Sequence, residues 1–154
     1  MTAEGCLSCD VIAGRKATPG GLIFEDALWS VTHQVSPAQL AGFLILQPIR
    51  HVEHVGDLSS EEAMAVGPIL ARSSQALMRV LAPDKVYVCS FGSEVKHVHF
   101  FLVPRLDAMP ADLSGPELLN EVFTGRWSCS DEEAADIAAR VRVELAKNPY
   151  FRPF

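Results

Sequence analysis

The chain has 154 residues, of which 49% are hydrophobic and 21% are charged, and its formal net charge is −6. This length and composition are typical of a single globular domain, here residues 1–154, that buries about 70% of its unfolded surface. The negative charge disfavours general binding to DNA, RNA or an anionic membrane. No apolar run approaches the ~20 residues that are needed to cross a bilayer.

The N-terminal segment carries a close pair of cysteines, Cys6 and Cys9, at the start of a short predicted helix that ends at Gly14. No basic region followed by an apolar run precedes them, so no secretory signal is predicted and the expected location is the cytoplasm. In that compartment a C-x-x-C pair favours metal or redox chemistry over a disulfide. The spacing is typical of half a tetrahedral zinc site completed by histidines, but from spacing alone two free thiols fit equally well.

Apolar and β-branched runs bounded by turn residues predict five strands, over residues 22–25, 28–33, 42–47, 85–90 and 96–105. A long helix is predicted over residues 60–82, opened by a capping box between Ser59 and Glu62. Pro68 should kink this helix or mark its first turns. Residues 111–154 should cover a core formed by residues 6–110, with two further helices predicted over 117–123 and 130–147.

The last predicted strand, residues 96–105, carries two histidines on one face. Side chains alternate across a strand, so His97 and His99 should project side by side, roughly 7 Å apart. A lone histidine in a strand is usually a satisfied core residue, whereas two on one face followed by Pro-Arg favour a site. His99 is the candidate nucleophile, because a neutral imidazole whose other nitrogen is held by an acceptor can attack phosphorus.

The turn before this strand is a candidate phosphate-binding segment, although an ordinary hairpin turn fits it as well. Glycine permits close approach of a ligand to the backbone, and successive amide groups can hold phosphate oxygens. The residues concerned are Gly92, Ser93, Glu94 and Val95. Three cationic residues could also contact phosphate, or could be ordinary surface charges: Arg50, Lys96 and Arg105. Trp29 and Phe43 could line a base pocket, or could be core residues.

Residues 97–105 resemble the signature of the histidine-triad (HIT) family, in which three histidines alternate with apolar residues and Pro-Arg often follows. Residues 6–15 are similar to the zinc-binding opening of bacterial members. Residues 24–26 match an aromatic-Glu-Asp strand end, and residues 42–51 match a segment of Gly, apolar residues, Pro, basic residues and His. The resemblance covers residues 6–110.

The resemblance implies an α+β fold with a five-stranded antiparallel sheet, one long helix, a short N-terminal helix, a C-terminal helical tail and a homodimer. It implies hydrolysis or transfer of nucleotides, on dinucleoside polyphosphates or nucleoside phosphoramidates, through a nucleotidyl-histidine on His99. It also implies a structural Zn²⁺ on Cys6, Cys9, His51 and His97, with His54 as the alternative to His51. The expected substrate-binding residues are Gly92, Ser93, Glu94, Val95 and Phe101.

Three departures from the family pattern bear on activity. Phe101 stands at the third histidine position, and a phenyl ring cannot donate a hydrogen bond. Glu94 stands where a small polar residue is common, and its carboxylate would repel a phosphate if it pointed into the site. The strand 30–33 lacks the aspartate that commonly binds ribose, which leaves Thr32 or His33 as weak substitutes. Phe101 and Glu94 therefore favour, as an alternative, a weak or inactive module that binds a nucleotide or a protein partner. A redox protein that uses Cys6 and Cys9 is a third possibility.

Overall fold

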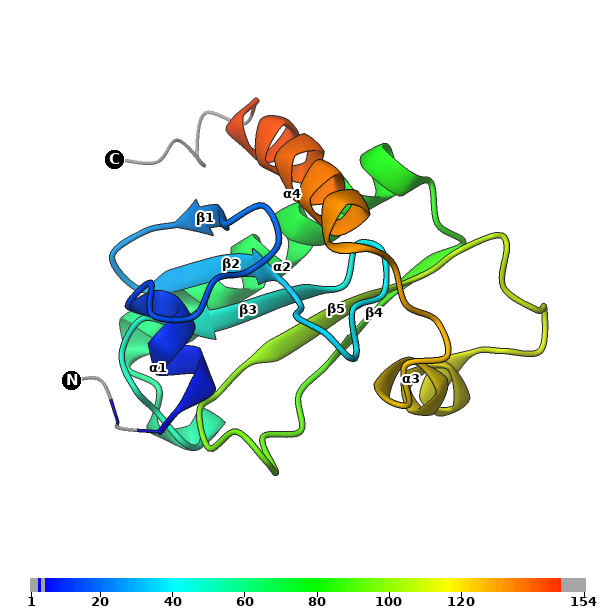
Figure 1. Ribbon diagram of the computed structural model, residues 1–154. Helices are drawn as coiled ribbons and strands as arrows, with labels where there is room; N and C mark the ends of the chain where they lie inside the picture. The colour runs from blue at the N-terminus through cyan, green and yellow to red at the C-terminus, as the bar shows by residue number, and fades with distance from the viewer. Residues whose placement is uncertain (1–2, 4, 148–154) are drawn as a thin grey trace.

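The computed structural model describes residues 3 and 5–147, and a five-stranded antiparallel sheet lies at its centre (Figure 1). The strands follow the order β1-β2-β3-β5-β4 across the sheet, which confirms the predicted α+β fold. Their bounds are β1 Leu22–Glu25, β2 Trp29–His33, β3 Leu44–Pro48, β4 Lys85–Cys89 and β5 Phe100–Arg105. The helices of the described residues are α1 Leu7–Ile12, the short 3₁₀ helix η1 Val55–Asp57, α2 Ser60–Leu81, α3 Gly115–Phe123 and α4 Asp131–Ala146.

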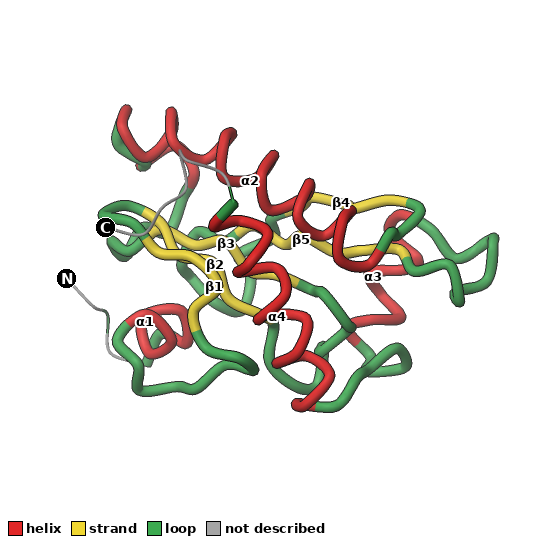
Figure 2. The backbone as a smooth tube through the Cα atoms, turned by 90° about the horizontal axis from the view of Figure 1, so that it is seen from above, coloured by secondary structure: helices red, strands yellow, loops and turns green. Residues whose placement is uncertain are grey.

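The sheet separates two hydrophobic cores, because alternate side chains of each strand point to opposite faces. Leu102 of β5 packs in the core that α2 and α4 cover, while its neighbours Phe101 and Val103 pack in the core that α3 covers. Helix α4 lies against α2 and the β1 end of the sheet (Figure 2). The segment after residue 110 thus contributes to both cores, and the single-domain boundary of 1–154 stays a prediction.

The capping box of α2 is present as predicted, and it also holds one of the candidate phosphate contacts. Glu62 accepts hydrogen bonds from the Ser59 amide at 2.7 Å and from Arg50 Nε at 3.0 Å. The Arg50 guanidinium holds the pKa of the Glu62 carboxyl below its usual value. Arg105 likewise bonds the carbonyls of Leu113 and Pro110. Both arginines are therefore occupied by structural partners.

Strand β5 begins at Phe100, four residues later than the sequence predicted. The His97 amide donates to the Val95 carbonyl at 2.8 Å, and the Val98 amide donates to the Val52 carbonyl at 2.7 Å. These bonds take the backbone out of the sheet ladder before the strand starts. His97 and His99 consequently lie in an irregular segment beside the loop after β3, and not within the strand itself.

His33 at the end of β2 is fully buried, and both of its ring nitrogens are bonded. Nδ1 donates to the Gln34 carbonyl at 2.9 Å, and Nε2 accepts from the Gly42 amide at 3.0 Å. A second ring proton would remove that acceptor, and burial lowers the pKa of His33. The ring therefore acts as a neutral brace between β2 and the turn before β3, and it has no free nitrogen for a ribose hydroxyl.

This brace predicts a loss of stability in mild acid. The unfolded histidine has a pKa near 6.5 and the folded one a lower pKa, so below about pH 6.5 the unfolded chain binds the extra proton first. The free energy of unfolding should fall by up to about 1.4 kcal/mol per pH unit from this residue. Urea unfolding of the wild type and His33→Gln at pH 7.5 and 5.5 should show a steeper decline in the wild type; parallel declines would contradict the assignment.

Candidate active site and zinc site

Two cysteines and two histidines from three parts of the chain meet at the N-terminal end of α1. Cys6 directly precedes α1 and Cys9 lies in it, while His51 follows β3 and His97 precedes β5. Their ligand atoms all lie within 4.8 Å of one another. The Sγ–Nδ1 distances are 3.5 Å for Cys6–His97, 3.4 Å for Cys9–His51 and 3.6 Å for Cys9–His97. Tetrahedral zinc bonds place a sulfur and a nitrogen ligand about 3.6 Å apart, so the spacing fits zinc.

The hydrogen bonds around these histidines fit the same interpretation. His97 Nε2 donates to the Pro48 carbonyl at 2.9 Å, which leaves its Nδ1 for a metal. His51 Nε2 lies 3.8 Å from a Glu53 carboxylate oxygen. Burial raises the pKa of the Cys6 thiol, so a cation is needed to hold this sulfur as a thiolate. Four protein ligands leave no open position, so the zinc is structural. His54, the alternative ligand, is exposed and outside the cluster.

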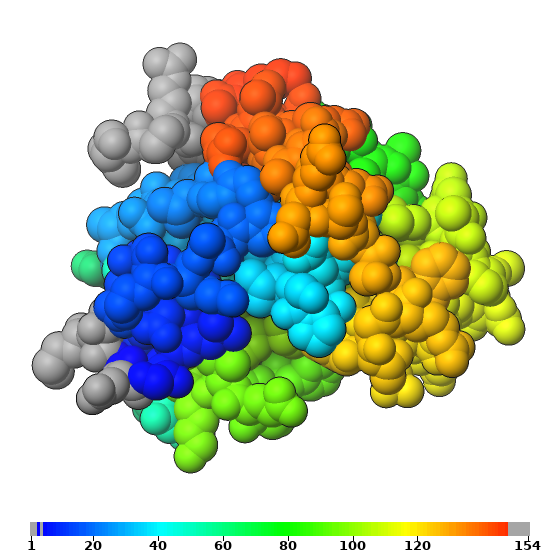
Figure 3. Space-filling view, viewed as in Figure 1, coloured from blue at the N-terminus to red at the C-terminus, as the bar shows by residue number. Residues whose placement is uncertain are grey.

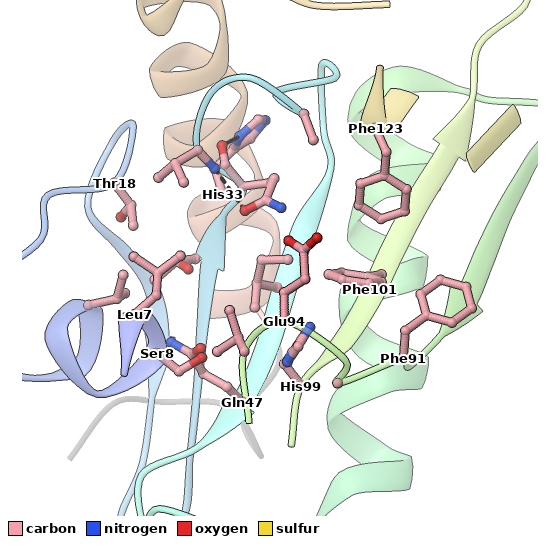
Figure 4. Close-up of a pocket in the computed structure, with 18 of the residues that line it drawn as sticks. Leu7, Ser8, Thr18, His33, Gln47, Phe91, Glu94, His99, Phe101 and Phe123 are labelled. Atoms are coloured by element: carbon pink, nitrogen blue, oxygen red, sulfur yellow. Dashed lines mark hydrogen bonds between the residues drawn. The ribbon is translucent and has the colours of Figure 1, made fainter. Parts of the chain in front are cut away.

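His99 lies two residues beyond this site, with its ring held in one orientation. Nδ1 donates to the His97 carbonyl at 2.7 Å, so Nε2 carries the lone pair. The side chain is only 8% exposed and lines a cavity of about 510 Å³ (Figure 4). Burial lowers the pKa of His99, which keeps the imidazole neutral at neutral pH. A neutral ring with an unprotonated nitrogen at a cavity can act as a nucleophile.

The cavity lies on the sheet face that faces away from α2. Leu7, Ser8 and Val11 of α1 line one side of it, while Phe101 and Phe123 line the other. Figure 3 shows the N-terminal segment, the loop after β2 and the loop before β5 meeting on one face of the molecule. Because Cys9 lies in α1 and Cys6 directly precedes it, the zinc site holds one wall of the cavity in place.

All five predicted substrate-binding residues line this cavity together with His99: Gly92, Ser93, Glu94, Val95 and Phe101. Their binding roles stay predictions. Figure 4 shows the Glu94 carboxylate directed into the cavity. Lys96 is exposed and does not line it, and Trp29 and Phe43 are fully buried core residues.

Sequence reasoning missed several residues that line the cavity. Gln34 directly follows β2 and lies one residue beyond His33, the last residue of the predicted strand. Gln47, the last residue of the strand predicted over 42–47, has a buried Nε2 without a hydrogen-bond partner among the described residues. Phe91 directly precedes the predicted phosphate-binding residues and lines the cavity with them, whereas Phe123 lies in α3 and only the fold brings it to the cavity.

The comparisons with known proteins agree with this geometry. A family model of the HIT domain matches residues 15–108. A zinc-bound histidine triad family protein from Mycobacterium smegmatis superposes with a TM-score of 0.70 at 19% identity, over 93% of this chain and 94% of that one. A hypothetical histidine triad nucleotide-binding protein from Sulfolobus tokodaii has a TM-score of 0.71 at 14% identity, over 96% and 99% of the two chains.

A HIT family hydrolase from Clostridium thermocellum is similar over 73% of this chain and 100% of its own length, with 19% identity and a TM-score of 0.56. At these identities the solved structures show a shared fold. No curated protein matches the chain by sequence. Within the part of the chain that the structure describes, every helix is too short or too polar to cross a membrane.

Proposed function

This chain belongs to the HIT domain family, and from that premise we propose that it is a nucleotide phosphohydrolase or nucleotidyltransferase that acts through a covalent intermediate on His99. One observation carries the proposal: the His99 ring donates through Nδ1 to the His97 carbonyl and lies at a cavity with its other nitrogen unprotonated. An imidazole in that state needs no prior deprotonation before it attacks an electrophile.

In the proposed reaction the Nε2 lone pair of His99 attacks the α-phosphorus of a nucleotide conjugate. The bond from phosphorus to the leaving group breaks, and its electron pair departs with the leaving group. The His97 carbonyl stabilises the positive charge that develops on the ring, because the bond from Nδ1 strengthens as that charge grows. Water then cleaves the phosphorus–nitrogen bond, which releases the nucleotide and restores the neutral ring.

The loop before β5 supplies the proposed phosphate contacts. The amide groups of Gly92, Ser93 and Glu94 donate to no backbone carbonyl among the described residues, so they are available to phosphate oxygens. Gly92 has a φ of +67°, which favours glycine at this position. Backbone donors bind phosphate oxygens without requiring a basic side chain.

Zinc would act structurally in this proposal. It would bind Cys6, Cys9, His51 and His97 and fasten α1 to the segments after β3 and before β5. A homodimer, which the family resemblance implies, and a cytoplasmic location, which was predicted separately from the sequence, belong to the same proposal.

The proposal predicts a trapped intermediate. Mixing the protein with a panel of adenosine and uridine monophosphate conjugates and quenching in the first turnovers should yield a nucleotidyl adduct, by intact-mass analysis, that peptide mapping places on His99. Phe101 cannot protonate a leaving group. Conjugates with strongly basic leaving groups should therefore react about 10²–10³-fold more slowly than conjugates whose leaving groups are weakly basic.

The second candidate function is a module that binds a nucleotide without reacting with it, which Phe101 and Glu94 favour. Nucleotides would then raise the melting temperature, and no adduct would form with any conjugate in the panel. That combination would contradict the catalytic proposal.

A further inference from the structure

Three phenylalanine rings form one wall of the cavity beside His99. Phe101 contacts the His99 ring with a centroid separation of 4.8 Å, and it is 6% exposed. Phe91 and Phe123 lie 5.9 Å and 5.5 Å from Phe101, and 6.4 Å from each other. These two outer rings are 58% and 40% exposed, so their faces remain available to a ligand. They come from the loop before β5 and from α3, and they adjoin the third histidine position of the family signature.

The charged side chains that line the cavity are the second feature of this site. Among the described residues that line it there is no lysine or arginine, and the one carboxylate is Glu94. Figure 4 shows this carboxylate on the same side of His99 as the rings of Phe101 and Phe123. A leaving group that carries further phosphates would place its negative charges beside Glu94 with no side-chain cation to offset them.

Phenyl faces and a carboxylate together attract one class of ligand. The negative faces of aromatic rings draw organic cations, and aromatic cages of this kind recognise quaternary and alkyl ammonium groups. A neighbouring carboxylate adds a direct Coulomb attraction. Neither feature favours a second nucleotide or a polyphosphate.

We propose that Phe91, Phe101, Phe123 and Glu94 form a leaving-group subsite for an organic cation, so that the preferred substrates are nucleoside monophosphate esters whose leaving group carries an ammonium group. This inference rests on the proposed function, since it assigns the side of the cavity opposite α1 to the leaving group. Phe101 offers no proton, so the substrate must carry a leaving group that departs as an anion, such as a phenolate.

The reaction then balances without a general acid at residue 101. Nε2 of His99 forms a bond to the α-phosphorus while the phosphorus–oxygen bond to the phenol breaks, and the phenolate leaves with the electron pair. Water adds to phosphorus, the bond to Nε2 breaks, and the proton released by water neutralises the phenolate. The products are the nucleoside monophosphate and the phenol, and the enzyme is unchanged.

Two matched substrates test this subsite: the adenosine 5′-monophosphate esters of 4-(trimethylammoniomethyl)phenol and 4-neopentylphenol. The first ester carries a quaternary nitrogen where the second carries a quaternary carbon. The two leaving groups therefore have nearly the same shape, and only the first is positively charged. We expect wild-type kcat/KM to favour the cationic ester by at least about tenfold. Glu94→Gln should reduce this ratio several-fold, and Phe123→Leu should reduce it as well. Glu61→Gln, at an exposed residue outside the cavity, should leave the ratio unchanged and controls for net charge.

Binding of the same two esters to His99→Ala, measured by calorimetry, separates this inference from the proposed function. If the wild type turns over neither ester but His99→Ala binds the cationic ester at least several-fold more tightly than the neutral one, the catalytic proposal fails and the subsite stands. Equal turnover and equal binding of the two esters would overturn the subsite alone. It would also be overturned if Phe123→Leu changed the oligomeric state in sedimentation while the ratio stayed constant, because the rings would then serve a subunit interface.

Discussion

Replacing His99 by alanine should lower kcat/KM by at least about 10⁴-fold, because it removes the atom that would form the bond to phosphorus. The adduct seen with the wild type by intact-mass analysis should disappear with the activity. Folding should change little in comparison, since the ring lies at the cavity and its one described hydrogen bond is to the His97 carbonyl two residues away. Steady-state kinetics and thermal melting of the same preparation measure the two effects separately.

A matched control is available in His54, which is exposed and lies outside both the cavity and the metal cluster. His54→Ala should retain wild-type turnover and melting. If His99→Ala kept a tenth or more of the wild-type rate, another group would be the nucleophile and the proposed mechanism would be wrong.

Removing the zinc should lower the melting temperature by about 10 °C, because a closed four-ligand site at this position is worth about 3–5 kcal/mol to the folded state. Cys9→Ser should have a similar effect. Cys9 is buried and its sulfur lies near both His51 and His97, so the substitution removes a central ligand. The kcat of the molecules that remain folded should change less than KM, because α1 lines the cavity but carries no reacting group.

Differential scanning calorimetry with and without a chelator, alongside metal analysis, measures the effect. Cys89→Ala is the control, since this half-buried cysteine belongs to no metal cluster among the described residues. A melting temperature that held while activity vanished on chelation would show that the ion takes part in the chemistry, against a structural assignment.

Much of the fold could be predicted because it depends on local patterns. Alternating apolar residues gave the strands, and the Ser59–Glu62 capping box gave the start of α2. The metal cluster was only half determined in this way. The spacing of Cys6 and Cys9 left free thiols as an equal alternative, and the family resemblance supplied the histidines that the structure places beside them.

What could not be predicted depends on contacts between distant residues. The amide of Val98 bonds the carbonyl of Val52, 46 residues earlier in the chain, and that bond delays the start of β5. Arg50 is a plausible phosphate contact in a linear sequence, and only the fold shows that Glu62 occupies it. Phe123 joins the cavity from a segment beyond the family match, where no motif pointed to it.

The metal cluster also has a consequence for the kinetics of folding. Its ligands Cys6 and His97 are separated by 91 positions in the sequence, so the ion can bind all four only after the intervening sheet has been assembled. An interaction that forms this late is weakly developed in the transition state and changes the rate of folding little. The stabilisation by zinc instead lowers the rate of unfolding, so the bound ion mainly prolongs the lifetime of the native state.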